Sequence, residues 1–127
     1  MKRLLLDTQV LLWWLLDDAM LGTKAKGAIA DPRNQVYVSA VSTWEISIKR
    51  QLGKLQAPED MSSIIEEERF IPLPISLYHG DQAGQLPELH KDPFDRMLVA
   101  QAQAEGLVII THDEAIAQYA VRTMATR

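Results

Sequence analysis

Four short apolar runs, widely spaced along the chain, constrain the fold more than any other feature of this sequence. Each is of strand length, and the last three contain β-branched residues: Leu4–Leu6, Val36–Val38, Ile71–Leu73 and Leu107–Ile110. None of them alternates cleanly between apolar and polar residues, as a strand with one face in water would. Such runs are typical of strands that are covered on both faces, which is the usual arrangement in a parallel sheet.

Helical patterns fill the intervals between these runs. They fall in seven segments: Gln9–Leu16, Thr23–Ala30, Thr43–Leu52, Asp60–Arg69, Leu77–Gln85, Pro93–Glu105 and Glu114–Tyr119. The helix at 93–105 is the best delimited, because Asp92 can cap its start, Pro93 suits its first position and Gly106 suits its end. With a last short strand at Val121–Met124, this alternation predicts an α/β fold. We expect a three-layer α/β/α sandwich with a short, mainly parallel sheet, in a single domain over residues 1–127.

The composition excludes several classes of protein. The chain has 127 residues, 47% of them hydrophobic, which excludes disorder, and it has no cysteine, which excludes disulfide scaffolds and thiolate zinc sites. Its net charge of −4 argues against a protein that holds nucleic acid mainly through a broad basic surface. The longest apolar run, Val10–Leu16, is far shorter than the roughly 20 residues that cross a bilayer. We therefore expect no membrane segment and a cytoplasmic location.

Acidic residues stand at the ends of three of the predicted strands. Asp7 directly follows the first strand, Glu45 lies in the first turn of the helix after the second, and Asp113 lies just beyond the fourth. Because the carboxyl ends of parallel strands meet at one edge of the sheet, these side chains are expected to face one crevice. Asp95, near the start of the helix at 93–105, can join them there.

Each acid also has a purely structural interpretation. Asp7, Asp92 and Asp113 can each cap the helix that follows. Glu45 can be the return half of a capping box that begins at Ser42. As a group, however, three or four carboxylates in one crevice repel one another unless their pKa values rise or a cation binds. Oxygen ligands without His or Cys favour Mg²⁺, with Mn²⁺ as a substitute, and such ions can activate a water for attack on a phosphodiester.

At these residues the chain resembles the PIN-domain ribonucleases, and among them the VapC-type toxins of toxin–antitoxin pairs. Four segments carry the resemblance: LLLDT at Leu4–Thr8, TWEISIK within Ser39–Lys49, DPFDRMLVAQA at Asp92–Ala102 and ITHD at Ile110–Asp113. In order and spacing they cover essentially the whole chain, and DPFDRMLVAQA is the most specific. The resemblance implies a metal-dependent endoribonuclease with these catalytic and metal-binding acids: Asp7, Glu45, Asp95 and Asp113. It also implies a cognate antitoxin as partner, an RNA substrate and a homodimer.

Supporting positions follow from the same resemblance. Thr8 and Thr111 fall where the family places small hydroxyl residues that support the acids, and Gln9 stands where many relatives carry His or Asn. Of the two acids that open the helix at 93–105, N-cap chemistry makes Asp95 the ligand and Asp92 the cap. The reverse assignment, or a shared role, stays open.

Basic and imidazole groups near the acids have two interpretations each. Arg96 follows Asp95 and can hold a phosphate at the rim of the crevice, or it can pair with a neighbouring acid. The three histidines lack a metal-binding spacing, so a zinc site is not expected: His79, His90 and His112. We interpret His90 and His112 as surface residues beside acids, with contact to substrate as the alternative.

The apolar run Val10–Leu16 needs its own explanation, because a helix with seven consecutive apolar residues cannot bury all of them against one core. One interpretation is a central helix surrounded by its own domain. The other is a groove for an antitoxin peptide or a second copy, with Leu12, Trp13 and Trp14 as contact residues. Trp44 is predicted in the core or as a stacking floor beside the acids.

Two functional hypotheses follow. The first is a Mg²⁺-dependent endoribonuclease that acts as the toxin of a toxin–antitoxin pair and cleaves RNA with a metal-activated water. The second is a non-catalytic α/β module whose strand-end acids only cap helices and whose apolar helix binds a partner. Mn²⁺ should stabilise the folded protein only under the first hypothesis.

Overall fold

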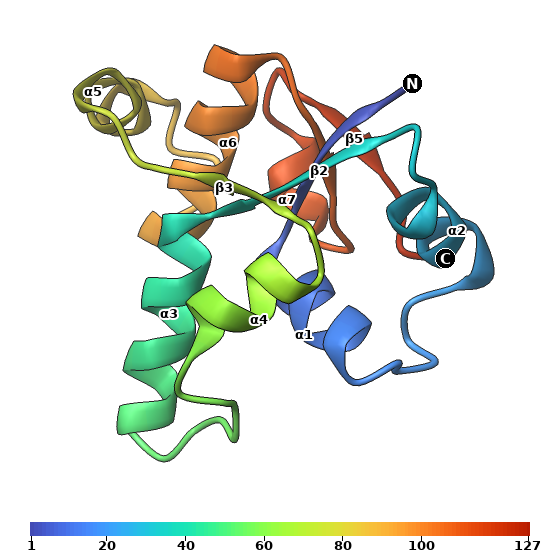
Figure 1. Ribbon diagram of the computed structural model, residues 1–127. Helices are drawn as coiled ribbons and strands as arrows, with labels where there is room; N and C mark the ends of the chain where they lie inside the picture. The colour runs from blue at the N-terminus through green and yellow to red at the C-terminus, as the bar shows by residue number, and fades with distance from the viewer.

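A computed structural model describes all residues from 1 to 127 and shows one sheet of five parallel strands (Figure 1). The strands are β1 (Arg3–Leu6), β2 (Gln35–Ser39), β3 (Ile71–Leu73), β4 (Val108–Ile110) and β5 (Arg122–Met124). Their order across the sheet is β3-β2-β1-β4-β5. The expected parallel sheet is therefore confirmed, and the apolar β1 is its central strand.

Seven helices connect the strands, as the sequence pattern predicts. They are α1 (Thr8–Leu15), α2 (Thr23–Ala30), α3 (Ala40–Gln51), α4 (Met61–Glu67), α5 (Leu77–Gln85), α6 (Pro93–Glu105) and α7 (Glu114–Ala117). None of them is long and apolar enough to cross a membrane.

Two apolar clusters, one on each face of the sheet, hold these layers together. Leu4 and Leu6 of β1 lie in the cluster beneath α1, α2 and α4, whereas Leu5 lies in the cluster beneath α6 and α7. All three leucines are fully buried, because successive side chains of a strand point to opposite faces and both faces are covered. Helix α5 packs outside α6, and α3 contributes to both clusters at the end of the sheet.

The strand order places a crevice at the carboxyl end of β1. The chain leaves β1 toward β2 and β3 on one side, and later returns to β4 and β5 on the other. In α/β sheets such a reversal of direction leaves space between the loops that follow the two neighbouring strands. Asp7 follows β1 immediately, and Thr111 and Asp113 follow β4, so the chain delivers them to the same crevice.

The predicted capping box of Ser42 and Glu45 is wrong. Helix α3 begins at Ala40, and its N-cap is Ser39, whose Oγ accepts a hydrogen bond from the backbone N–H of Val41. The last residue of β2 thus caps the helix directly, with no intervening turn. Glu45 consequently lies in the second turn of α3 rather than in the first, and its carboxylate is free for another role.

The apolar run at 10–16 is mostly core. Val10, Leu11, Leu12 and Trp13 are buried in the cluster beneath α1, and Trp14 packs half-buried against Phe70 with ring centroids 6.2 Å apart. The structure therefore favours the central-helix interpretation. Leu12 and Trp13 are not available as an exposed groove, because the chain's own sheet and helices cover them.

Candidate functional site

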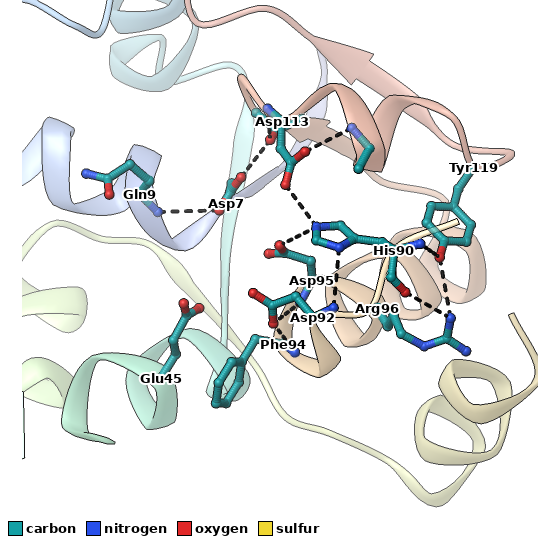
Figure 2. Close-up of polar contacts among 12 residues, drawn as sticks. Asp7, Gln9, Glu45, His90, Asp92, Phe94, Asp95, Arg96, Asp113 and Tyr119 are labelled. Carbon is teal, nitrogen blue, oxygen red and sulfur yellow. Dashed lines mark hydrogen bonds and ion pairs between the residues drawn. The ribbon is translucent and has the colours of Figure 1, made fainter. Parts of the chain in front are cut away.

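The predicted acids converge on one cleft of about 400 Å³ at the carboxyl end of the sheet. Five carboxylate side chains line it, from four different parts of the fold: Asp7, Glu45, Asp92, Asp95 and Asp113. Lys49, Lys54 and His112 also line it. Figure 2 shows the acids pointing toward a common space from the start of α1, from α3, from the start of α6 and from the start of α7.

Asp7 is the most deeply placed of the aspartates. It is the N-cap of α1, with Oδ1 accepting from the backbone N–H of Gln9 at 3.4 Å and Oδ2 accepting from Thr111 Oγ1 at 2.6 Å. Burial raises the pKa of Asp7, although these hydrogen bonds partly offset the effect. Thr8 does not touch the acids directly. Its Oγ1 donates to Ser42 Oγ at 2.8 Å and ties α1 to α3, which carries Glu45.

Glu45 has one occupied and one unpartnered oxygen. Its residue surface is 5% exposed, and Oε2 accepts a hydrogen bond from Lys49 Nζ at 2.6 Å, one helical turn further along α3. This contact raises the pKa of Lys49. Oε1 is buried and has no hydrogen-bond partner, the only buried side-chain polar atom of the protein in that condition. A buried carboxylate oxygen without a donor is costly, so this atom indicates a missing positive or donating group.

Asp92 and Asp95 differ in the way that N-cap chemistry predicts. Asp92 caps α6, accepting from the backbone N–H groups of Phe94 at 2.8 Å and Asp95 at 3.4 Å. The Asp95 carboxylate takes no part in the cap and faces the cleft. Burial, with the nearby charges of Asp7 and Asp92, raises the pKa of Asp95 to about 7.

Asp113 is the N-cap of α7, with Oδ1 accepting from the backbone N–H of Ala115 at 2.9 Å. Its Oδ2 lies 3.0 Å from His90 Nε2. Partial burial pushes the pKa of Asp113 upward, but the hydrogen bonds from Ala115 and His90 outweigh that effect, so the pKa lies below its ordinary value. Each acid therefore combines a capping or holding contact with a position in the cleft, so the capping and metal-binding interpretations are compatible.

His90 is the residue that sequence reasoning missed. The prediction placed it on the surface beside the acids, but its Nε2 lies 2.8 Å from Asp95 Oδ2 and 3.0 Å from Asp113 Oδ2 (Figure 2). These three groups can present ligand atoms within 4.8 Å of one another. Partial burial alone would lower the pKa of His90, yet the two carboxylates raise it above its ordinary value. The only sequence signal was its position two residues before the N-cap of α6.

Arg96 has neither of its predicted roles. Its guanidinium makes no ion pair with an acid and points away from the cleft in Figure 2. Its NH groups instead donate to four backbone carbonyls and one hydroxyl: those of Ala83, Leu86, Pro87 and His90, and Oη of Tyr119. These carbonyls lie at the end of α5 and in the irregular connection that follows it, where regular structure leaves backbone acceptors open, and Arg96 donates to each of them.

Two predicted aromatic residues, Trp13 and Trp44, do not line the cleft. Trp13 is buried and contacts the exposed His112, which lines the cleft, with ring centroids 5.0 Å apart. Trp44 is 59% exposed, so its predicted place in the core is wrong, and its ring meets Phe94 edge to face at 5.3 Å. Successive residues of a helix point about 100° apart. Burial of Glu45 therefore turns Trp44 outward.

The donor set suits a hard divalent cation. It is built from carboxylate oxygens, includes one buried oxygen with no partner, and contains no sulfur ligand. Mg²⁺ and Mn²⁺ prefer such oxygen ligands. The residues present therefore fit a divalent ion, and the raised pKa values of Asp7 and Asp95 show the electrostatic cost that such an ion would relieve.

Comparison with known proteins agrees with this geometry. The family model that matches is the PIN domain, over residues 4–122. Ribonuclease VapC16 of Mycobacterium tuberculosis is 38% identical over 71 residues, which are 54% of this chain and 49% of that protein. The chain thus aligns with about half the length of this curated relative.

Solved structures share the whole architecture. The DNA-bound VapBC structure from Salmonella typhimurium matches with a TM-score of 0.67 and 17% identity over 100% of both chains. A toxin–antitoxin complex from Klebsiella pneumoniae matches with a TM-score of 0.63 and 20% identity over 97% of each chain. At these identities the likeness is one of fold. Because the PIN-domain model spans nearly the entire sequence, the chain belongs to the PIN-domain family.

Proposed function

We propose that this protein is a divalent-metal-dependent endoribonuclease, using Mg²⁺ with Mn²⁺ as a substitute, and that it acts as the toxin of a toxin–antitoxin pair. The observation that carries the proposal is the buried, unpartnered Oε1 of Glu45, which lies in a cleft lined by four further carboxylates. Capping accounts for an aspartate at a helix start, but it does not account for a buried glutamate in the second turn of α3.

Four acids would hold the metal: Asp7, Glu45, Asp95 and Asp113. The chemistry that a divalent ion would supply there is activation of a water molecule and stabilisation of the charge that develops on the phosphodiester. The chain's own residues orient these acids. Thr111 holds Asp7 Oδ2, Lys49 holds Glu45 Oε2, and the N-cap contact with Ala115 holds Asp113 Oδ1. Asp92 stabilises the start of α6, which carries Asp95.

The negative charges of these acids make the binding of RNA depend on the cation. Without a bound ion, the carboxylates repel a phosphate group, and only Lys49 and Lys54 in the cleft wall oppose them. An RNA strand can therefore enter productively only when the acids are neutralised. This explains how a chain with a net charge of −4 can act on RNA without a broad basic surface.

The proposed partners rest on the relatives. The Salmonella typhimurium and Klebsiella pneumoniae proteins were solved as VapBC and toxin–antitoxin complexes. By analogy, we propose a cognate antitoxin for this protein, a homodimer as its assembly, and action on RNA in the cytoplasm. Residues 1–127 would act as one catalytic domain.

Cleavage of total cellular RNA in Mg²⁺, mapped by sequencing of the new ends, tests the activity. The wild-type protein should cut at defined sites, and Asp95→Asn should not. Asp60→Asn is the control, because Asp60 is an exposed aspartate at the start of α4, outside the cleft. If Asp95→Asn cuts as well as the wild type does, the acids are not catalytic and the proposal is wrong.

A metal titration separates the enzyme from a non-catalytic module. An ion that binds only the folded state at 100 times its Kd stabilises that state by about 2.7 kcal/mol. Mn²⁺ should therefore raise the melting temperature of the wild type, and Asp7→Asn should abolish the rise. Identical responses of the two proteins would support the alternative, in which the acids only cap helices.

A further inference from the structure

We propose that His90 is a positioning residue of the acid site, whose Nε2–H group holds one oxygen each of Asp95 and Asp113 and keeps both carboxylates turned into the cleft. This inference rests on the function proposed above and adds a residue that the acidic pattern does not contain. The two contacts, 2.8 Å to Asp95 Oδ2 and 3.0 Å to Asp113 Oδ2, join acids that come from different parts of the fold.

The backbone of His90 is fixed from two sides. The hydroxyl of Tyr119 accepts a hydrogen bond from His90 N–H at 2.9 Å and donates to the carbonyl of Pro87 at 2.9 Å. Arg96 donates to the same Pro87 carbonyl at 3.1 Å and to the His90 carbonyl at 3.4 Å (Figure 2). The connection between α5 and α6 has no regular structure of its own, so these side chains set the position from which the imidazole reaches the acids.

The ring orientation identifies His90 as a donor rather than a metal ligand. The backbone N–H of Asp92 points at Nδ1 from 3.3 Å, so Nδ1 acts as the acceptor. In a neutral imidazole the hydrogen must then sit on Nε2, the atom that faces the two carboxylates. Ligation through Nε2 would need the hydrogen on Nδ1, where it would meet the N–H of Asp92. Histidines that bind metals normally have an acceptor at that place instead.

The Nε2–H group of His90 influences the orientation of the Asp95 and Asp113 carboxylates in the cleft. Asp95 and Asp113 both lie within hydrogen-bond distance of a single nitrogen, so their charges repel each other at short range. The Nε2–H group hydrogen-bonds to Asp113 Oδ2 and contacts Asp95 Oδ2 at 2.8 Å, so it holds the pair together at the edge of the cleft. Groups that orient ligating carboxylates in this way contribute about 10- to 100-fold to metal affinity.

The test is Mn²⁺ affinity, measured at one fixed pH by electron paramagnetic resonance of the free ion. His90→Ala should weaken Mn²⁺ binding by about 10- to 100-fold. His90→Gln should restore part of the loss, because its amide N–H group can replace the Nε2–H donor. Glu88→Gln is the matched control from the same connection, since Glu88 is exposed and makes no hydrogen bond or ion pair. Circular dichroism checks that each variant is folded.

A second variant acts on the support of His90 without changing the ring. Tyr119→Phe removes all three hydrogen bonds of the hydroxyl, with His90, Pro87 and Arg96, and should weaken Mn²⁺ binding in the same direction but less than His90→Ala does. This arm remains informative if His90→Ala fails to fold.

The outcomes separate this inference from the function beneath it. If the wild type binds Mn²⁺ and Asp7→Asn abolishes binding, but His90→Ala binds as tightly as the wild type or more tightly, only the role of His90 is refuted. Tighter binding would show that the imidazole competes with the ion. If the wild type does not bind Mn²⁺, the proposed function fails and the inference fails with it.

Discussion

Replacing Asp95 by asparagine should stabilise the protein against unfolding at pH 8 in the absence of divalent ions. Burial and the charges of Asp7 and Asp92 raise the pKa of this carboxyl group, so its ionised form is less favourable in the folded chain than in the unfolded one. Asparagine keeps the shape of the side chain, and its amide oxygen can stay in contact with His90 Nε2. The substitution therefore removes a repulsive charge and little else.

The magnitude follows from the pKa. A rise from the ordinary 3.8 to about 7 corresponds to about 4 kcal/mol if the whole shift is expressed as stability. Solvent reaches part of the carboxylate and screens the repulsion, so we expect about 1–2 kcal/mol. For a chain of this size that corresponds to roughly 3–8 °C in Tm.

The difference in stability between the wild type and Asp95→Asn depends on pH between about pH 4 and pH 7. Below about pH 4 the carboxyl group is protonated in both the folded and the unfolded wild type, so the two proteins should be equally stable. As the pH rises from about 4 to about 7, the unfolded chain ionises before the folded one, and the wild type loses stability relative to Asp95→Asn. Above about 7 the difference should be constant.

Urea denaturation of both proteins in EDTA at pH 4, 6 and 8 measures this difference directly. Excess Mn²⁺ should reverse the order at pH 8, because the wild type gains binding energy that the variant lacks. The reasoning is refuted if Asp95→Asn is no more stable than the wild type at pH 8 in EDTA. It is also refuted if the difference does not change between pH 4 and pH 8.

Three further substitutions test the framework of the site, each by urea denaturation. Arg96→Ala removes one donor from each of four backbone carbonyls and should cost about 2–4 kcal/mol; a loss below about 0.5 kcal/mol would show that water replaces the guanidinium. Gln101→Ala leaves the buried Ser39 hydroxyl without its acceptor and should cost about 2–3 kcal/mol, and unchanged stability would contradict the importance of that bond. Gly106→Ala places a side chain at φ 68° and should cost about 1–2 kcal/mol, whereas a stabilised variant would mean that the backbone at the end of α6 readjusts.

The sequence predicted an element well where several neighbouring residues independently marked its ends or its burial. Helix α6 spans the predicted residues, because the N-cap Asp92, the proline at its first position and the left-handed Gly106 all mark its ends. The strands were predictable because residues buried on both faces must be apolar throughout. The convergence of the acids followed from the rule that parallel strands present their carboxyl ends at one edge.

The error at the start of α3 arose because the sequence offers two possible N-cap residues there. Ser39 and Ser42 can each cap a helix, and the sequence favoured Ser42 because a glutamate follows three residues later. In the structure β2 runs directly into α3, so Ser39 takes the cap and Ser42 is used to bind Thr8. The prediction could not anticipate this, because it depends on how α1 and α3 pack.

Long-range contacts limited the prediction of the site. His90 meets Asp113 across 23 residues, and Arg96 meets the carbonyls of a connection with no periodic pattern. Neither contact has a signature within a few residues of sequence. The acids could be predicted because a residue that directly follows a parallel strand must lie at the carboxyl edge of the sheet. A histidine in an irregular connection can point in any direction.

The central position of β1 has a consequence for the synthesis of the protein. The first of these five strands to be synthesised lies between β2 and β4, and the Asp7 carboxylate is held by a threonine 104 residues further along the chain. At about 5–20 residues per second, translation needs roughly 5–20 s to deliver that threonine. A growing chain therefore holds Asp7 and Glu45 long before it holds Thr111 and Asp113. The order of translation itself delays completion of the acidic cleft.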